Sequence, residues 1–220
     1  MKPAVIFDLD GTLIDSAPDI HASANRAFAP LGQSFSRAEV QGFVGRGAPN
    51  LISRLAQSRG LSGTGAAFDD LLARFLEIYE QSHGLTALYP GVLTALDDLA
   101  RTGARLGVCT NKPIGPTRAV LGHFGLGCFA AVVGGDSLPV KKPDPAPLLH
   151  ALDLLGGGPM IFVGDSEVDA ETAQAARVPF LLFTEGYRKT PVEALTHQAA
   201  FADFADLPGL VAGISATAAP

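Results

Sequence analysis

Short runs of apolar residues alternate with helical patterns near the beginning of the chain and through its second half. Runs without polar interruption are typical of strands that are buried on both faces of a parallel sheet. The runs that we predict to be strands are Val5–Phe7, Leu106–Cys109, Ala131–Val133, Met160–Val163 and Phe180–Phe183. Helices are predicted between them, near residues 92–102, 114–124, 145–155 and 168–177. This alternation predicts right-handed βαβ units, and therefore an α/β fold built on a parallel sheet.

The segment from about residue 17 to residue 85 has a helical periodicity and no comparable alternation of strands and helices. Pro18 after Ser16 marks a helix start, and Ser36 with Glu39 forms the sequence pattern of a capping box. Apolar residues then recur at helical spacing through the rest of the segment. We therefore expect an all-helical insert of about four helices within the α/β fold.

Composition and charge narrow the class of protein. The chain has 220 residues, of which 47% are hydrophobic and 17% charged, so it can bury a substantial core. No apolar run approaches the roughly 18 residues that cross a bilayer. We expect no membrane span, no signal peptide and a cytoplasmic location. The net charge of -6 argues against a nucleic-acid surface.

Two further local predictions concern the cysteines and the end of the chain. We expect Cys109 and Cys128 to be buried free thiols. We expect the tail after Leu210 to be frayed.

Two carboxylates, Asp8 and Asp10, follow the first apolar run, and Gly11 comes next. Side chains alternate along a strand, so acids two residues apart point to the same side at its end. Such a pair suits phosphoryl transfer, in which one carboxylate attacks phosphorus and the other moves a proton. A plain polar turn without a catalytic role is the alternative. A calcium-binding loop is excluded, because the chain lacks the later residues that such a loop needs. Gly11 allows a sharp turn that brings the backbone close to a ligand.

Polar residues also follow the later apolar runs, where an open α/β sheet places its ligand crevice. Thr110 and Asn111 offer a hydroxyl and backbone N–H groups at a helix start, which could hold phosphate oxygens or form only a helix cap. Lys142 precedes Pro143 in a loop with a restricted backbone, and its ammonium group could balance the charge of a nucleophile and a phosphate. We expect Lys141 to be an ordinary surface lysine.

Further acids stand at the end of the fourth predicted strand, where Asp165 lies in the turn and Asp169 one helical turn later. If Asp8 joins them, three carboxylates repel one another unless a cation lies between them. Ligand sets made only of oxygen atoms suit Mg²⁺. The chain has no Gly-Lys pair and hence no Walker phosphate loop.

These motifs resemble those of the haloacid dehalogenase superfamily of phosphohydrolases. The motifs are Asp8-Leu9-Asp10-Gly11-Thr12, Thr110-Asn111-Lys112, Lys142-Pro143 and Gly164-Asp165-Ser166 with Asp169. Their order and spacing match across essentially the whole chain, and the residues around them are most similar to phosphoglycolate phosphatases. The resemblance implies a Rossmann-like core, residues 1–15 and 86–220, with an inserted all-helical cap domain of the C1 type, residues 16–85. Arg177 departs from the pattern, because relatives usually carry Gly after that helix.

The resemblance also implies roles for single residues. Asp8 would attack phosphorus, and Asp10 would act as general acid and then as general base. Thr110 and the backbone of Asn111 would position the phosphoryl group, and Lys142 would balance its charge. The implied ligands of Mg²⁺ are Asp8, the backbone carbonyl of Asp10 and Asp165, with Asp169 in support.

The implied activity is hydrolysis of a small phosphate monoester, with 2-phosphoglycolate as the leading substrate. A β-phosphoglucomutase, a pyrophosphatase, and a sugar or nucleotide phosphatase share the same core residues, and a non-enzymatic binding module is a further alternative. Arg46 lies between Gly45 and Gly47, and it could grip a substrate carboxylate or stand in a solvent-facing turn. We expect a small phosphorylated metabolite as partner, no nucleic acid or membrane, and a monomer or a homodimer.

Overall fold

The protein is described by a computed structural model over residues 2–217, and its centre is a six-stranded parallel sheet. The order of the strands is β5-β4-β1-β6-β7-β8, and every neighbouring pair is parallel. The strands are β1 Ala4–Phe7, β4 Arg105–Cys109, β5 Ala131–Val133, β6 Met160–Gly164, β7 Phe180–Phe183 and β8 Ala199–Phe201. Five of them were predicted. The edge strand β8 was missed because it has only three residues, of which only Phe201 is buried.

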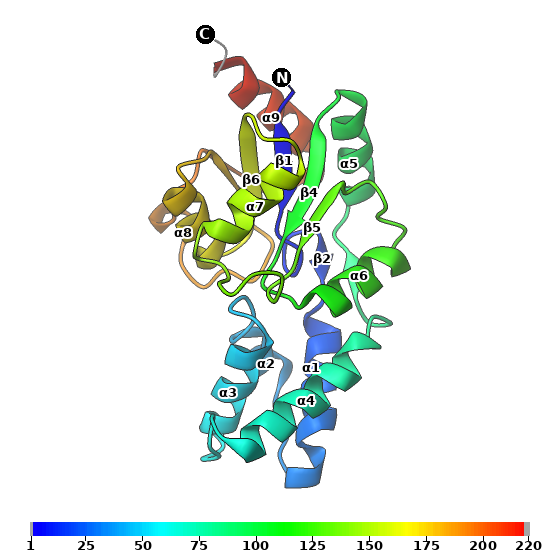
Figure 1. The fold of residues 1–220 in the computed structure, drawn as a ribbon, viewed down its shortest axis with the longest axis vertical. Coiled ribbons are helices and arrows are strands. Elements are labelled where there is room, and N and C mark those ends of the chain that lie inside the picture. Colours follow the sequence, from blue (N-terminus) through cyan, green and yellow to red (C-terminus); the bar gives the residue numbers. More distant parts are fainter. Residues whose placement is uncertain (1, 218–220) are drawn as a thin grey trace.

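Helices cover both faces of the sheet, which makes the fold Rossmann-like (Figure 1). They are α5 Val92–Arg101, α6 Ile114–His123, α7 Ala146–Leu154, α8 Glu167–Ala176 and α9 Leu207–Thr217. Alternate residues of β1 point to opposite faces, so Val5 and Phe7 join one apolar cluster while Ala4 and Ile6 join the other. Helices α5, α6 and α9 pack in the first cluster, and α7 and α8 in the second. The four helices predicted between the strands are confirmed.

Two expectations about this part of the chain were wrong. The tail after Leu210 is not frayed up to Thr217, because Val211 is buried against the sheet and α9 continues past it. Residues 218–220 lie outside the described part. Cys109 is a buried free thiol as expected, whereas Cys128 is exposed. In both cases composition alone was a poor guide, since contact with the sheet decides which residue is buried.

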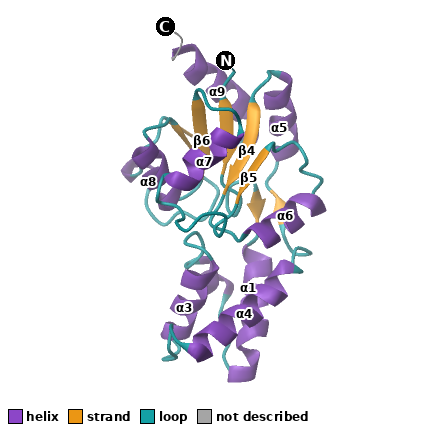
Figure 2. Ribbon diagram, viewed as in Figure 1, coloured by secondary structure: helices purple, strands orange, loops and turns teal. Residues whose placement is uncertain are grey.

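The segment between β2 and β3 folds into a separate group of helices at the carboxyl ends of the strands (Figure 2). The α-helices are α1 Ala17–Phe28, α2 Arg37–Gln41, α3 Ala48–Ser58 and α4 Ala66–Glu80. They enclose their own apolar cluster, which includes Phe28, Ile52, Leu55 and Phe75. The capping box at Ser36 and Glu39 is present as predicted. Ser16 precedes α1 but makes no side-chain cap.

Two chain connections join this helical group to the sheet domain. Their ends pair as the short antiparallel strands β2 Ile14–Asp15 and β3 Ala87–Leu88. Asp19 at the start of α1 accepts hydrogen bonds from the backbone N–H of Leu85 and the hydroxyl of Thr86, at 2.9 and 2.7 Å. The two connections are therefore tied together beside the site described below. Within the described residues, no helix is long and apolar enough to span a membrane.

Candidate active site

The carboxyl ends of three adjacent strands bring the predicted polar residues together. Asp8 follows β1, Thr110 follows β4, and Asp165 follows β6, with Asp169 in the first turn of α8. Parallel neighbouring strands end at the same edge of the sheet, so these side chains converge. One carboxylate oxygen from each of Asp8, Asp165 and Asp169 lies within 4.8 Å of the others, and all three residues are buried.

Lys142 is the cation beside this cluster. Its Nζ lies 2.8 Å from Oδ1 of Asp8 and 2.7 Å from Oδ1 of Asp169, and its side chain is almost fully buried. Burial by itself lowers the pKa of Lys142, but attraction by Asp169 and Asp8 outweighs it and holds that pKa above its usual value. Lys142 is therefore charged. The structure brings Lys142 into the cluster as the sequence indicated, whereas neighbouring Lys141 is only half-buried.

The cluster carries more negative charge than its one lysine balances. Burial raises the pKa of Asp8 from 3.8 to about 6, although Lys142 works against this rise. Burial also raises the pKa of Asp165, and repulsion by Asp169 and Asp8 adds to it. Oδ1 of Asp8 is at ion-pair distance from Lys142, but the geometry gives this buried atom no hydrogen-bond donor among the described residues. A cluster of carboxylate oxygens with an excess of negative charge fits a divalent metal ion.

Hydrogen bonds hold Asp165 and Asp169 in place. Asp165 accepts from the hydroxyl of Thr12 at 2.8 Å and from the backbone N–H of Tyr187 at 2.7 Å. Oδ2 of Asp169 accepts from the hydroxyl of Ser166 at 2.6 Å and from its backbone N–H at 3.1 Å, and the second bond belongs to the capping box of α8. Both oxygens of Asp169 are thus engaged, one by Lys142 and the other by the turn.

The backbone comes very close to Asp165 at two glycines. A Cβ at Gly11, whose φ is +93°, would lie 2.5 Å from Oδ2 of Asp165. A Cβ at Gly186 would lie 2.3 Å from the Cβ of Asp165. No side chain fits at these distances, so glycine is required for space at both positions. The sharp turn expected at Gly11 is confirmed.

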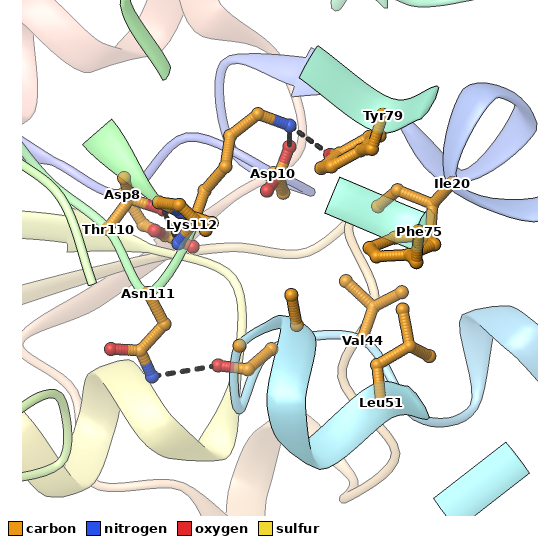
Figure 3. A pocket seen from close by; sticks show the side chains of 14 residues that line it. Asp8, Asp10, Ile20, Val44, Leu51, Phe75, Tyr79, Thr110, Asn111 and Lys112 are labelled. Carbon is orange, nitrogen blue, oxygen red and sulfur yellow. Dashed lines mark hydrogen bonds and ion pairs between the residues drawn. The ribbon is translucent and has the colours of Figure 1, made fainter. Parts of the chain in front are cut away.

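Asp10 lies beside the cluster and has partners of its own. Its Oδ1 accepts from the hydroxyl of Ser16 at 2.6 Å and from Nζ of Lys112 at 3.0 Å. Nζ of Lys112 also donates to the hydroxyl of Tyr79 on α4 and lies 4.1 Å from the centre of its ring (Figure 3). The sequence marks Ser16 only as the start of a helix and gives no sign of a role for Tyr79. Tyr79 stands four residues after Phe75 and has the spacing of an ordinary core residue.

Asn111 joins the loops on either side of the site. Its Nδ2 donates to the backbone carbonyl of Lys142 at 2.9 Å and to that of Gly45 at 3.0 Å, and the second bond is drawn in Figure 3. Its buried Oδ1 has no hydrogen-bond partner among the described residues. Thr110 is buried and lines the same pocket as Asp8. Arg46, next to Gly45, is exposed and lines a cavity of about 470 Å³ that reaches Asp8, Asp10 and Asp165.

Comparisons with known proteins agree with this geometry. Residues 5–183 match the family described as haloacid dehalogenase-like hydrolases, and the chain belongs to this family. It is 50% identical over 212 residues to a phosphoglycolate phosphatase of Cereibacter sphaeroides, a match that covers 95% of this chain and 97% of the relative. It is 47% identical over 219 residues to a phosphoglycolate phosphatase of Rhodobacter capsulatus, covering 97% of this chain and 98% of the relative. These similarities identify the chain as a phosphoric monoester hydrolase.

A solved structure shows the same architecture. The crystal structure of a predicted phosphoglycolate phosphatase from Haemophilus somnus superimposes with a TM-score of 0.88 at 32% identity. The match covers 95% of this chain and 97% of that chain. It therefore includes both the parallel sheet and the helical group next to it.

Proposed function

We propose that this protein hydrolyses 2-phosphoglycolate, or a closely related small phosphate monoester, through a phosphorylated Asp8. The observation that carries the proposal is the position of Asp8, buried at the end of β1 between Lys142 and the two other acids. A second carboxyl group, Asp10, lies beside it for proton transfer. The names of the relatives that match almost the whole chain support the choice of substrate.

The first half of the reaction transfers the phosphoryl group to the protein. An oxygen of Asp8 attacks phosphorus, and the bond between phosphorus and the leaving oxygen breaks. Asp10 gives its proton to that oxygen, which leaves as an alcohol. Lys142 balances the negative charge on the nucleophile and the phosphoryl oxygens, while the hydroxyl of Thr110 and the backbone N–H of Asn111 position them. In the second half, Asp10 takes a proton from water, and the hydroxide displaces Asp8 and releases phosphate.

The acidic cluster is the proposed site of Mg²⁺. Asp8, the backbone carbonyl of Asp10 and Asp165 would hold the ion, because all three are oxygen ligands of the kind that Mg²⁺ prefers. When bound, Mg²⁺ supplies charge that offsets repulsion between the nucleophile and the phosphoryl group. Asp169 supports the site by holding Lys142 and the turn after β6.

We further propose the division into a core, residues 1–15 and 86–220, and a helical cap, residues 16–85. The separate apolar cluster of α1–α4 supports this division. Arg46 belongs to the cap loop over the larger cavity, and we propose that it attracts and helps to bind the anionic substrate. The cytoplasmic location and the monomeric or homodimeric state stay predictions from the sequence.

Release of inorganic phosphate from a panel of esters tests the function. We expect 2-phosphoglycolate to give the highest kcat/KM, and Asp8→Asn to abolish turnover and any acid-stable trace of phosphorylated protein. Asp10→Asn is expected to reduce turnover by roughly 10²–10⁴-fold, because it removes only proton transfer. Near-normal turnover by Asp8→Asn would show that no phosphoaspartate forms. Phosphate transfer without release, or a preference for pyrophosphate, sugar phosphates or nucleotides, would assign one of the alternative activities.

A further inference from the structure

A small chamber lies beside Asp10, between the ends of the strands and the helical group, with a volume of about 40 Å³ (Figure 3). A water molecule needs roughly 10–15 Å³, so the chamber has room for a small ligand group. The two-carbon acid part of 2-phosphoglycolate is a group of this kind. The side of the chamber formed by the helices is apolar and consists mainly of Ile20, Val44, Leu51 and Phe75.

Lys112 is the cation among the described residues that line this chamber. Its residue is only 6% exposed, and Nζ bonds to Oδ1 of Asp10 and to the hydroxyl of Tyr79. An ammonium group has three N–H donors, so one is left without a hydrogen-bond acceptor in the described part of the chain. Buried charges need such partners, because removing them from water is costly. Asp8 and Asp10 also line the chamber, and Asp10 engages one of the three donors of Lys112. The spare donor of Lys112 is a group in the chamber that suits an anionic ligand group.

We propose that Lys112 determines substrate specificity by binding the carboxylate of the leaving group inside this chamber. The inference rests on the proposed phosphatase function and names the residue that selects the substrate. Lys112 favours a leaving group that is small enough to enter the chamber and that ends in a negative charge. Nζ of Lys112 also bonds to Asp10, the residue that we propose protonates the leaving oxygen. A substrate carboxylate bound to Nζ therefore lies close to Asp10.

Arg46 occupies a different position from Lys112. It is exposed and lines the larger cavity, whereas Lys112 lines the small chamber and is buried. A charge in the chamber is shielded from water and discriminates more sharply between charged and neutral ligands than an exposed one. We therefore assign attraction at the entrance to Arg46 and selection of the leaving group to Lys112.

Two substrates of similar size separate this role from a general effect on catalysis. The pair is 2-phosphoglycolate and 2-hydroxyethyl phosphate, which lacks the carboxylate. We expect Lys112→Met to lower kcat/KM for 2-phosphoglycolate at least tenfold more than for 2-hydroxyethyl phosphate. The reason is that only 2-phosphoglycolate has a carboxylate whose hydrogen bond to Lys112 the substitution removes. Lys2→Met is the control, because Lys2 is exposed and lines neither cavity, and it should leave the ratio of the two values unchanged.

Binding gives a second measurement that does not need turnover. In the Asp8→Asn protein, calorimetry should show tighter binding of 2-phosphoglycolate than of 2-hydroxyethyl phosphate, and adding Lys112→Met should remove that difference. Circular dichroism checks that the variants are folded. An equal loss for both ligands would overturn the proposal and leave Lys112 as a partner of Asp10 alone. If the parent protein hydrolyses neither ester, the proposed function itself fails; if the parent prefers the acid and Lys112→Met keeps that preference, only the role of Lys112 fails.

Discussion

Arg177 shows how one residue can hold a conformation that its side chain disfavours. It ends α8 with φ +56° and ψ +46°, the left-handed region in which the Cβ of most residues is crowded. Among the described residues it is the one residue other than glycine with a positive φ. The backbone N–H of Arg177 bonds to carbonyls of the last turn of α8. The helix therefore ends in the usual way although glycine is absent at this position.

Replacing Arg177 by glycine should stabilise the protein. We expect Arg177→Gly to raise the free energy of unfolding by about 1 kcal/mol, since glycine adopts this φ without crowding and the gain exceeds its higher entropy in the unfolded chain. Urea denaturation measures the change. Arg177→Ala is the control, because it removes the long side chain and keeps Cβ, and it should give no such gain. Equal stability of Arg177→Gly and the parent would show that the position is unstrained.

Asp8 should make metal binding depend on pH. The pKa of Asp8 in the folded, metal-free protein is about 6, above the usual 3.8. The protonated carboxyl group therefore contributes to the free energy of unfolding fully below about pH 4, and this contribution is lost as the pH rises through 6. Mg²⁺ needs the deprotonated carboxylate. We expect Mg²⁺ to raise the melting temperature more at about pH 7.5 than at about pH 5. In Asp8→Asn this dependence should weaken, and an equal effect of Mg²⁺ at both pH values in the parent would contradict the prediction.

At the scale of elements, the loop after β7 connects the acidic cluster to the start of α1. Tyr187 gives its backbone N–H to Asp165, and its hydroxyl donates to Oδ1 of Asp15 at 2.7 Å. The same hydroxyl accepts from the backbone N–H of Ala17 at 2.9 Å. One residue therefore contacts both the proposed metal site and the connection that leads into the helical group.

Removing the hydroxyl of Tyr187 should loosen that connection and leave the acidic cluster intact. Tyr187→Phe keeps the backbone bond to Asp165 and removes the two hydrogen bonds of the hydroxyl, while the N–H of Ala17 keeps a longer bond to Oδ1 of Asp15 at 3.3 Å. A lost hydrogen bond of this kind costs about 0.5–1.5 kcal/mol of stability. We expect a lower urea midpoint with unchanged affinity for Mg²⁺. Thr184→Val, in the same loop, removes a hydroxyl that bonds only to Glu185 among the described residues, and it should change neither quantity appreciably. A loss of Mg²⁺ affinity in Tyr187→Phe would show that the hydroxyl also shapes the cluster.

At the scale of the whole molecule, apolar packing and the acidic site are separate. Two apolar clusters lie on the faces of the sheet and a third lies within α1–α4, and none includes the acids. The hydrophobic effect is the dominant favourable term in folding, and we therefore expect the fold to form without a bound ion. Figure 1 shows the helical group next to the carboxyl ends of the strands, and residues from both parts line the pocket beside Asp8 and Asp10.

Chelation should therefore abolish activity without unfolding the protein. In excess chelator we expect no release of phosphate from 2-phosphoglycolate and an unchanged far-ultraviolet circular dichroism spectrum. Adding Mg²⁺ should restore turnover, while Ca²⁺ should restore little, because its longer bonds and looser coordination misplace the nucleophile. Full turnover in excess chelator would remove the metal from the mechanism.

The amino-acid sequence by itself determined the five main strands, the helices between them and the residues at the strand ends. Local patterns suffice for these features, because burial on both faces of a sheet demands continuous apolar runs and parallel strands end at one edge. Only the tertiary structure brought Tyr79 to Lys112 and Tyr187 to Asp15. These pairs are 33 and 172 residues apart along the chain, and no local pattern encodes such a contact. The short edge strand β8 and the buried part of α9 likewise depend on packing against the sheet.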